Sequence, residues 1–260
     1  MRILSNILLT FAFLIVPAHA ESISSLWQTE KSQHFIIYYQ NAPAEFIDEL
    51  VYKAEDYYNS IMEELGFRRF DFWTWDNRAK IYLYNDKSSY LKETQDKIWS
   101  AGQVSIRSRV IKTFIGQNNF FDSILPHEMT HIIFRDLVGL KARLPLWIDE
   151  GVACSQEKSN LPERMKTAKS FVENGAYLKL DRLSEIFSLN LIVPELFYSE
   201  SASLIVFLMS TYGKESFLDF SRKLRDGEEW QEAILNTYRF SNLAELETAW
   251  KNFILQQEQF

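Results

Sequence analysis

The chain has 260 residues, a formal net charge of −7 and a hydrophobic fraction of 47%. That much apolar material excludes an intrinsically disordered chain, and the scattered Lys and Arg residues form no basic stripe of the kind that binds nucleic acid. The single cysteine, Cys154, excludes an intrachain disulfide, so the fold must depend on a packed core, for which a chain of this length has enough residues.

The first 20 residues have the pattern of a secretory signal peptide. Arg2 supplies the positive start, residues 3–16 form the apolar stretch, and Ala18 to Ala20 form an Ala-x-Ala cleavage site that would start the mature chain at Glu21. An uncleaved anchor is the alternative, but the apolar stretch is shorter than the roughly 20 residues that span a bilayer. We therefore expect a secreted chain with no membrane span after cleavage. A periplasmic location suits its single cysteine better than a disulfide-rich extracellular one.

Apolar and β-branched runs predict strands in the first half of the chain. Residues 34–39 and 79–84 are rich in Ile and Tyr, and a helix with one apolar face is expected between them, over residues 43–66. Residues 102–106 and 109–115 alternate well enough to form a β-pair joined by a short turn. This half of the chain therefore predicts a sheet with at least one helix packed on it.

Two histidines with helical spacing follow these strands. His127 and His131 lie four residues apart, so on a helix both imidazoles occupy one face, one turn apart. Neutral imidazole suits Zn²⁺, and the carboxylate of Glu128 can reach a metal-bound water, so the His-Glu-x-x-His motif supplies two ligands and a base. The alternative is a surface helix whose His and Glu side chains are solvated. Two of the four histidines of the chain lie in this motif, which favours a metal site.

A catalytic zinc site needs a third protein ligand besides a water molecule. Glu150 lies in a Trp-Ile-Asp-Glu-Gly-Val-Ala segment that begins at Trp147, with eighteen residues between it and His131. Gly139 and Pro145 lie in this gap, so the chain can turn and bring a second helix back to the first. The two segments at this spacing resemble the gluzincin metallopeptidases, the thermolysin-like clan. The Trp-x-x-Glu-Gly-x-Ala form is closer to the aminopeptidase-type and peptidase MA-like branches than to thermolysin itself.

This resemblance implies the roles of four residues. It makes His127, His131 and Glu150 the ligands of one zinc ion per chain, and Glu128 the general base.

The same resemblance implies an α+β fold. The expected N-terminal lobe, residues 21–157, is a mixed β-sheet and helix lobe with the zinc helix. A mostly helical lobe, residues 158–260, follows and closes the cleft. In the family, the strand before the zinc helix is a sheet edge that pairs with an extended substrate, so residues 109–115 are the candidate edge strand. The alternative is an ordinary hairpin whose edge is covered.

The position one turn beyond Glu150 departs from the family pattern. In thermolysin-like enzymes an Asp at this offset orients a ligand histidine, whereas this chain has Cys154, which does that poorly. We therefore expect Ser155, Asp149 or a backbone carbonyl to hold the histidine, or else a site that is tuned differently. Cys154 itself is expected to be a small buried residue in a tight helix contact.

Helical periodicity replaces strand patterns after Asn160. Gluzincins commonly place a Tyr or His in this region that donates a hydrogen bond to the developing oxyanion, and Tyr198 is the candidate because no histidine follows His131. Packing of Tyr198 at a helix start is the alternative. The predicted helices cover residues 161–173, 183–189, 194–213, 215–224, 228–235 and 242–260.

The expected activity is hydrolysis of a peptide or protein substrate by a zinc-activated water. One alternative is a zinc-binding module without catalytic activity that binds peptides or a protein partner, although the intact Glu128 argues against it. The other alternative is a structural protein in which the motif is coincidental, and it predicts no stoichiometric metal.

Overall fold

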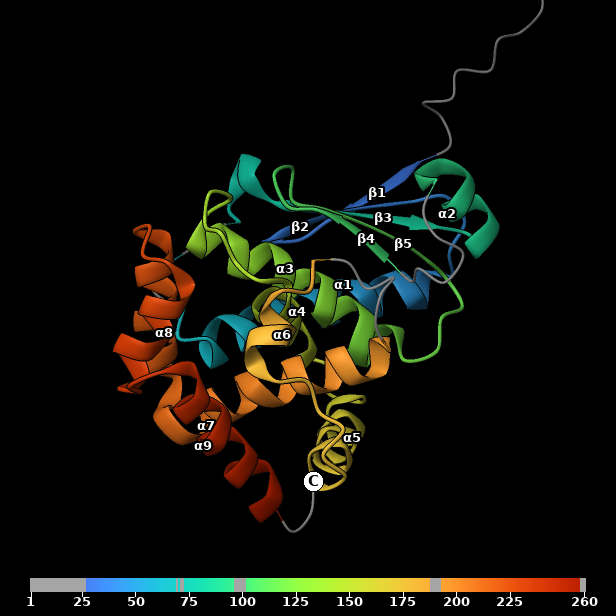
Figure 1. Ribbon diagram of the computed structural model, residues 1–260. Helices are drawn as coiled ribbons and strands as arrows, with labels where there is room; N and C mark the ends of the chain where they lie inside the picture. Colours follow the sequence, from blue (N-terminus) through green and yellow to red (C-terminus); the bar gives the residue numbers. More distant parts are fainter. Residues whose placement is uncertain (1–26, 69, 71–72, 96–101, 188–192, 258–260) are drawn as a thin grey trace, which may run out of the picture.

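The computed structural model describes residues 27–68, 70, 73–95, 102–187 and 193–257. The predicted signal peptide and the predicted mature start at Glu21 lie outside these residues. Figure 1 shows a sheet at the top of the molecule and helices packed below it.

Five strands form one mixed sheet in the order β1-β2-β3-β5-β4. The three inner strands, β2 (Phe35–Tyr39), β3 (Ala79–Tyr84) and β5 (Val110–Phe114), are parallel to one another. β1 (Gln28–Lys31) and β4 (Gly102–Ser105) pair antiparallel at the two ends of the sheet. β1 carries no strand signal in the sequence, because its four residues are polar and all exposed.

The period-2 alternation of the strands gives the sheet one buried face and one partly exposed face. Ile37, Ile81 and Ile111 lie side by side in the register and are almost completely buried. Helices α1 (Ala44–Glu64) and α3 (Leu125–Val138) lie on this buried side and contact each other (Figure 1).

The position of the edge strand corrects one expectation. Residues 109–115 were the candidate edge, but β5 lies between β3 and β4, and β4 is the last strand in the order. One side of β5 pairs in parallel with β3 from Val110 to Phe114. β4, which precedes β5 in the chain, therefore pairs with the other side of β5. Strand periodicity shows that a segment is extended but not which neighbour it takes, so the sequence could not decide this point.

The chain after β5 is helical, as predicted. α7 (Pro194–Arg225) is broken at Gly213, which has a φ of +79° and lies where the sequence predicts the end of one helix and the start of another. The helix predicted over residues 183–189 is wrong in its bounds, because α6 begins at Leu180 and ends at Ser184; residues 188 and 189 lie outside the described part. The helices that follow α3 are α4 (Leu146–Ser155), α5 (Leu161–Glu173), α6 (Leu180–Ser184), α7 (Pro194–Arg225), α8 (Trp230–Tyr238) and α9 (Leu243–Gln256).

α4 and α7 approach unusually closely at one glycine. A Cβ atom on Gly151 would lie 2.4 Å from the backbone oxygen of Ser201, a distance that real Cβ atoms do not show. The Glu-Gly pair in the predicted motif is therefore a packing requirement as well, because glycine lets α4 lie against α7 next to Glu150.

The fold class is confirmed as α+β, with a mixed sheet in the N-terminal part and a mostly helical C-terminal part. The lobe boundary at residue 157 stays a prediction. Among the described residues, no helix combines the length and the apolar composition that crossing a membrane requires.

Candidate metal centre

A π-helical turn, Phe120–Ile124, leads into α3, and Pro126 lies in the first turn of that helix. Because proline has no N–H, the carbonyl of Asp122 loses its helical donor, and it accepts a hydrogen bond from the backbone N–H of Ser159 at 3.3 Å instead. The hydroxyls of Ser123 and Ser159 lie 2.5 Å apart beside it. These bonds tie the start of α3 to the turn after α4 and fix that turn relative to the zinc motif.

The structure brings together the three predicted metal ligands. Nε2 of His127 lies 3.1 Å from Nε2 of His131, and Oε2 of Glu150 lies 3.6 Å and 3.7 Å from these two nitrogens. This oxygen is buried and has no hydrogen-bond partner in the described part of the chain, which is costly for a carboxylate unless a cation faces it. Two imidazole nitrogens and one carboxylate oxygen are the donor set of a catalytic zinc site, so the residues fit a zinc ion.

Glu128 lies on the same turn of α3 and is packed against the edge strand. A Cβ atom on Gly102, the first residue of β4, would lie 2.7 Å from Oε1 of Glu128. Glycine at this position therefore makes room for the carboxylate. Burial raises the pKa of Glu128 above its ordinary value, while the nearby histidines oppose that shift.

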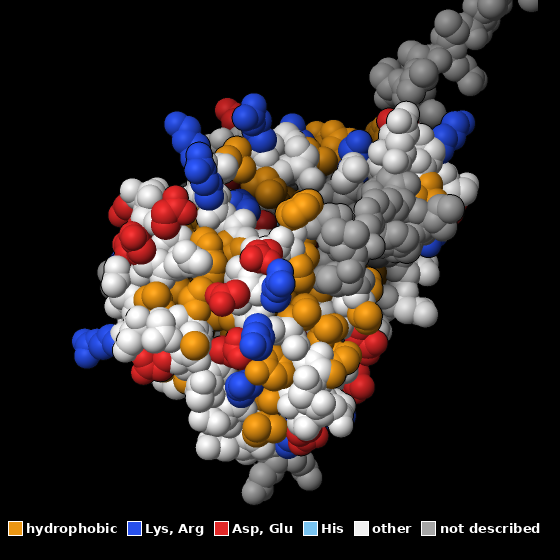
Figure 2. Space-filling view, in the orientation of Figure 1, with side chains coloured by type: hydrophobic (Ala, Val, Ile, Leu, Met, Phe, Trp, Pro, Cys, Tyr) orange, Lys and Arg blue, Asp and Glu red, His pale blue; other side chains and the backbone are white. Residues whose placement is uncertain are grey.

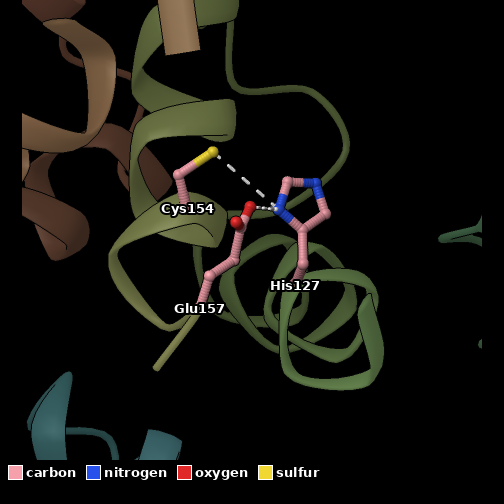
Figure 3. Close-up of side chains that lie close together, drawn as sticks. All are labelled: His127, Cys154 and Glu157. Atoms are coloured by element: carbon pink, nitrogen blue, oxygen red, sulfur yellow. Dashed lines mark hydrogen bonds and ion pairs between the residues drawn. The ribbon is translucent and has the colours of Figure 1, made fainter. Parts of the chain in front are cut away.

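Glu157, which was not among the predicted site residues, contacts the Nδ1 side of the His127 ring. Oε1 of Glu157 lies 2.8 Å from Nδ1 of His127, on the side of the ring away from Glu150, and Sγ of Cys154 lies 3.9 Å from the same nitrogen (Figure 3). Glu157 also accepts hydrogen bonds from Asn160 and from the guanidinium of Arg164. Burial would raise the pKa of Glu157, but its partners lower it to about 2, so this group is a carboxylate.

Of the two side chains expected to hold a ligand histidine, Asp149 lies beside His131, whereas the partner of His127 is Glu157 and not Ser155. Ser155 donates its hydroxyl to the carbonyl of Val152 and does not contact His127. Cys154 is fully buried, as expected, and its sulfur is only a distant neighbour of the ring. Glu157 lies two residues beyond the end of α4, so no helical spacing in the sequence signals its position beside His127.

Asp149 lies beside the other histidine. Its Oδ1 is 3.6 Å from Nδ1 of His131, which is longer than a normal hydrogen bond, and its Oδ2 is held by the guanidinium of Arg135 at 3.0 Å. Burial alone would lower the pKa of His131, but the carboxylates of Asp149, Glu150 and Glu128 raise it to about 9. The same three carboxylates would stabilise a metal cation bound to His131 in place of the proton.

Tyr198 lies at the wall of the cavity that contains the metal motif. The cavity has a volume of about 490 Å³ and is lined by residues of β4, α3, α4, α5 and α7, among them His127, Glu128, Glu150 and Tyr198. The guanidinium of Arg164 lies over the Tyr198 ring at 5.3 Å. Burial raises the pKa of Tyr198, so its hydroxyl keeps its proton at neutral pH and remains a hydrogen-bond donor. Its role toward a substrate stays a prediction.

A protein-family model matches more than half of the chain. The family described as Peptidase MA superfamily matches residues 75–256, a range that contains α3, α4, α7 and all five predicted site residues. The comparison with curated proteins gave no match.

Proposed function

The chain belongs to the peptidase MA superfamily, and from that premise we propose that it is a zinc-dependent peptidase of the gluzincin type. The observation that carries the proposal is the buried Oε2 of Glu150, which lacks a hydrogen-bond partner in the described structure and faces Nε2 of both His127 and His131. These three residues would hold one zinc ion per chain. A zinc ion bound there would lower the pKa of its water to about 7 and polarise the substrate carbonyl.

The residues of the chain have separate tasks in this reaction. Glu128 accepts the proton of the attacking water and later delivers it to the leaving amine. Tyr198 donates its hydroxyl to the carbonyl oxygen as negative charge develops on it. Glu157 accepts the Nδ1–H of His127, which leaves the Nε2 lone pair of that ring directed toward Glu150 and His131.

The test separates metal binding from catalysis. We expect one zinc per chain in the purified protein, no zinc in His127→Ala, and full zinc content in Glu128→Gln with a loss of at least about 100-fold in peptide-library hydrolysis. Glu163→Gln is a matched control, because this glutamate is exposed on α5 outside the cavity. Stoichiometric zinc without hydrolysis in the wild type would show a binding module instead. No zinc after reconstitution would show a coincidental motif.

We also propose that the chain is exported and resides in the periplasm. The support is the sequence of the first 20 residues, with Arg2, the apolar stretch of residues 3–16 and the Ala-x-Ala site that ends at Ala20. Cell fractionation followed by N-terminal sequencing tests this proposal. A mature chain that begins at Glu21 is expected, and a cytoplasmic chain with an intact N-terminus would contradict it.

A further inference from the structure

The face of the sheet opposite to α1 and α3, which we call the outer face, is partly open. Tyr38, Tyr82 and Lys112 lie side by side on β2, β3 and β5, and Lys31, Ile36 and Lys80 form the neighbouring row on β1, β2 and β3. All six side chains alternate with inward-facing neighbours and are partly or fully exposed. The short helix α2 (Lys87–Thr94) packs only at one end of this face, over Tyr84 and Phe114.

The outer face is positively charged although the chain as a whole is acidic. Its two rows contain Lys31, Lys80 and Lys112 and no carboxylate, and none of these lysine side chains forms an ion pair with a described residue. Glu30, the acidic residue of β1, lies on the other side of the sheet, where it lines a groove with Asp48 of α1. Figure 2 shows more blue than red side chains along the upper edge of the molecule, where the sheet lies. The chain has a net charge of −7, so this segregation directs the face toward an anionic partner.

Aromatic rings lie between these lysines. The rings of Tyr38 and Tyr82 are stacked with centroids 4.6 Å apart, and Trp27 meets Tyr82 and Tyr84 edge-on at 5.5 Å and 5.3 Å. Tyr and Trp combine an apolar ring with a polar group, and for this reason they concentrate at the boundary between water and lipid. A soluble polyanion without apolar groups would satisfy the lysines but would leave these rings without a matching apolar layer.

The described part of the chain begins on this same face. Trp27 is the first described residue, and its contacts with Tyr82 and Tyr84 place it on the outer face. The preceding sequence contains the apolar stretch of residues 3–16. The predicted membrane-directed segment therefore precedes, in the sequence, a residue that lies on the outer face.

We propose that the outer face docks on a membrane surface that contains anionic phospholipid. Lys31, Lys80 and Lys112 face the headgroups, and the rings of Tyr38 and Tyr82 lie at the level where headgroups meet acyl chains. Docking in this way covers none of the residues that line the metal cavity, because β4 contributes Gly102 and Val104 to the cavity and both belong to the other face. The proposal is independent of the peptidase activity.

The test is co-sedimentation of the chain that begins at Glu21 with vesicles of phosphatidylglycerol and phosphatidylcholine in equal parts, beside vesicles of phosphatidylcholine alone. The wild type should bind the anionic vesicles at low salt and lose them as salt is raised. The variant with Lys31→Gln, Lys80→Gln and Lys112→Gln should bind them on the order of 100-fold more weakly. The matched control changes three exposed lysines outside this face to Gln: Lys141, Lys166 and Lys179.

Each outcome decides the proposal. Equal weakening in the triple variant and in the control would show a general charge effect and overturn it, as would the absence of wild-type binding to anionic vesicles. Binding to heparin or to single-stranded DNA, but not to vesicles, would replace the membrane with a soluble polyanion. If the triple variant fails to show the wild-type circular dichroism spectrum, Lys31→Gln alone, at an exposed edge position, should still weaken vesicle binding roughly fivefold.

Discussion

Glu157 is the most firmly held carboxylate beside the candidate metal centre. It accepts hydrogen bonds from Arg164 and Asn160, and it faces Nδ1 of His127 at 2.8 Å. A carboxylate in this position fixes both the tautomer and the direction of a ligand imidazole. The affinity of the site for zinc should therefore depend on a residue outside the two motifs.

We expect Glu157→Gln to weaken zinc binding by roughly 10- to 100-fold, because the amide is a poorer acceptor for Nδ1–H and does not balance the charge of Arg164. Competition with a chromophoric chelator at pH 7 measures the affinity. Glu163→Gln is the control, because the Glu163 side chain is 77% exposed and pairs with Lys166 on the same helix, away from the metal centre. An unchanged zinc affinity in Glu157→Gln would show that the His127 ring is held by its packing alone.

Gly102 controls the space available to the proposed base. An alanine Cβ at this position would lie 2.7 Å from Oε1 and 3.1 Å from Cδ of Glu128, so the carboxylate must move. We expect Gly102→Ala to keep its zinc and to lose about 100-fold in kcat, because the base no longer reaches the water in the required geometry. Gln103→Ala, on the other face of the same strand, should keep its activity. Full activity in Gly102→Ala would remove Glu128 from the proposed role.

At the scale of elements, α3 and α4 show which parts of the site can be predicted from short-range sequence patterns. The spacing of His127 and His131 predicts their common face, and the turn between the two helices is signalled by Gly139 and Pro145. No short-range pattern of this kind predicts the position of Glu157. Glu157 lies beyond the end of α4, in the turn that the bond from Ser159 N–H to the Asp122 carbonyl ties to the segment before α3.

α7 contains a buried carboxyl group whose titration should be visible in the stability of the fold. Both oxygens of Glu200 face the backbone N–H of Leu178, at 3.0 Å and 3.2 Å. Burial raises the pKa of Glu200 to about 8, the Leu178 N–H opposes the shift, and the carboxylate of Glu247 adds to it. The folded chain therefore holds a proton that the unfolded chain releases near pH 4.5.

The sign of this effect follows from the raised pKa. Since the unfolded chain binds fewer protons between pH 4.5 and about 8, the contribution of Glu200 to the free energy of unfolding falls as pH rises through this window, by up to roughly 1.4 kcal/mol per pH unit. Glu200→Gln removes that slope. Urea unfolding at pH 5, 6, 7 and 8 with a chelator present should show the wild type losing stability relative to this variant. The exposed Glu195→Gln on the same helix should run parallel to the wild type, and a parallel Glu200→Gln curve would contradict the raised pKa.

At the scale of the whole molecule, the order of strands was the part that the sequence could not supply. The succession of strands before helices predicts an α+β fold, and it does so correctly. The edge of the sheet, however, depends on which side of β5 is taken by β3, a contact between residues about 30 positions apart in the chain. Tyr198 likewise reaches the cavity from α7, which packs closely on α4 at Gly151, a contact between distant parts of the sequence.

A zinc ion at the candidate metal centre would join α3 and α4 beside the Arg135–Asp149 ion pair that already links these helices, so zinc should add to the stability of the fold. His127 and His131 come from α3, and Glu150 comes from α4 across the turn. An ion that binds only the folded chain raises the free energy of unfolding by about 4 kcal/mol when its free concentration is a thousand times its dissociation constant. Without the ion, Oε2 of Glu150 is buried with no described hydrogen-bond partner, which lowers the stability of the fold.

We therefore expect a chelator to lower the Tm of the wild type by several degrees and zinc to restore it in a concentration-dependent way. His127→Ala should start from the lower Tm and respond to neither reagent, which separates zinc binding from any direct effect of the chelator. Glu128→Gln should respond as the wild type does, because Glu128 is not one of the three ligands. A wild-type Tm that stays constant while metal analysis shows that zinc has been removed would mean that α3 and α4 hold their positions without the ion. The site would then be pre-formed by packing rather than assembled by its metal.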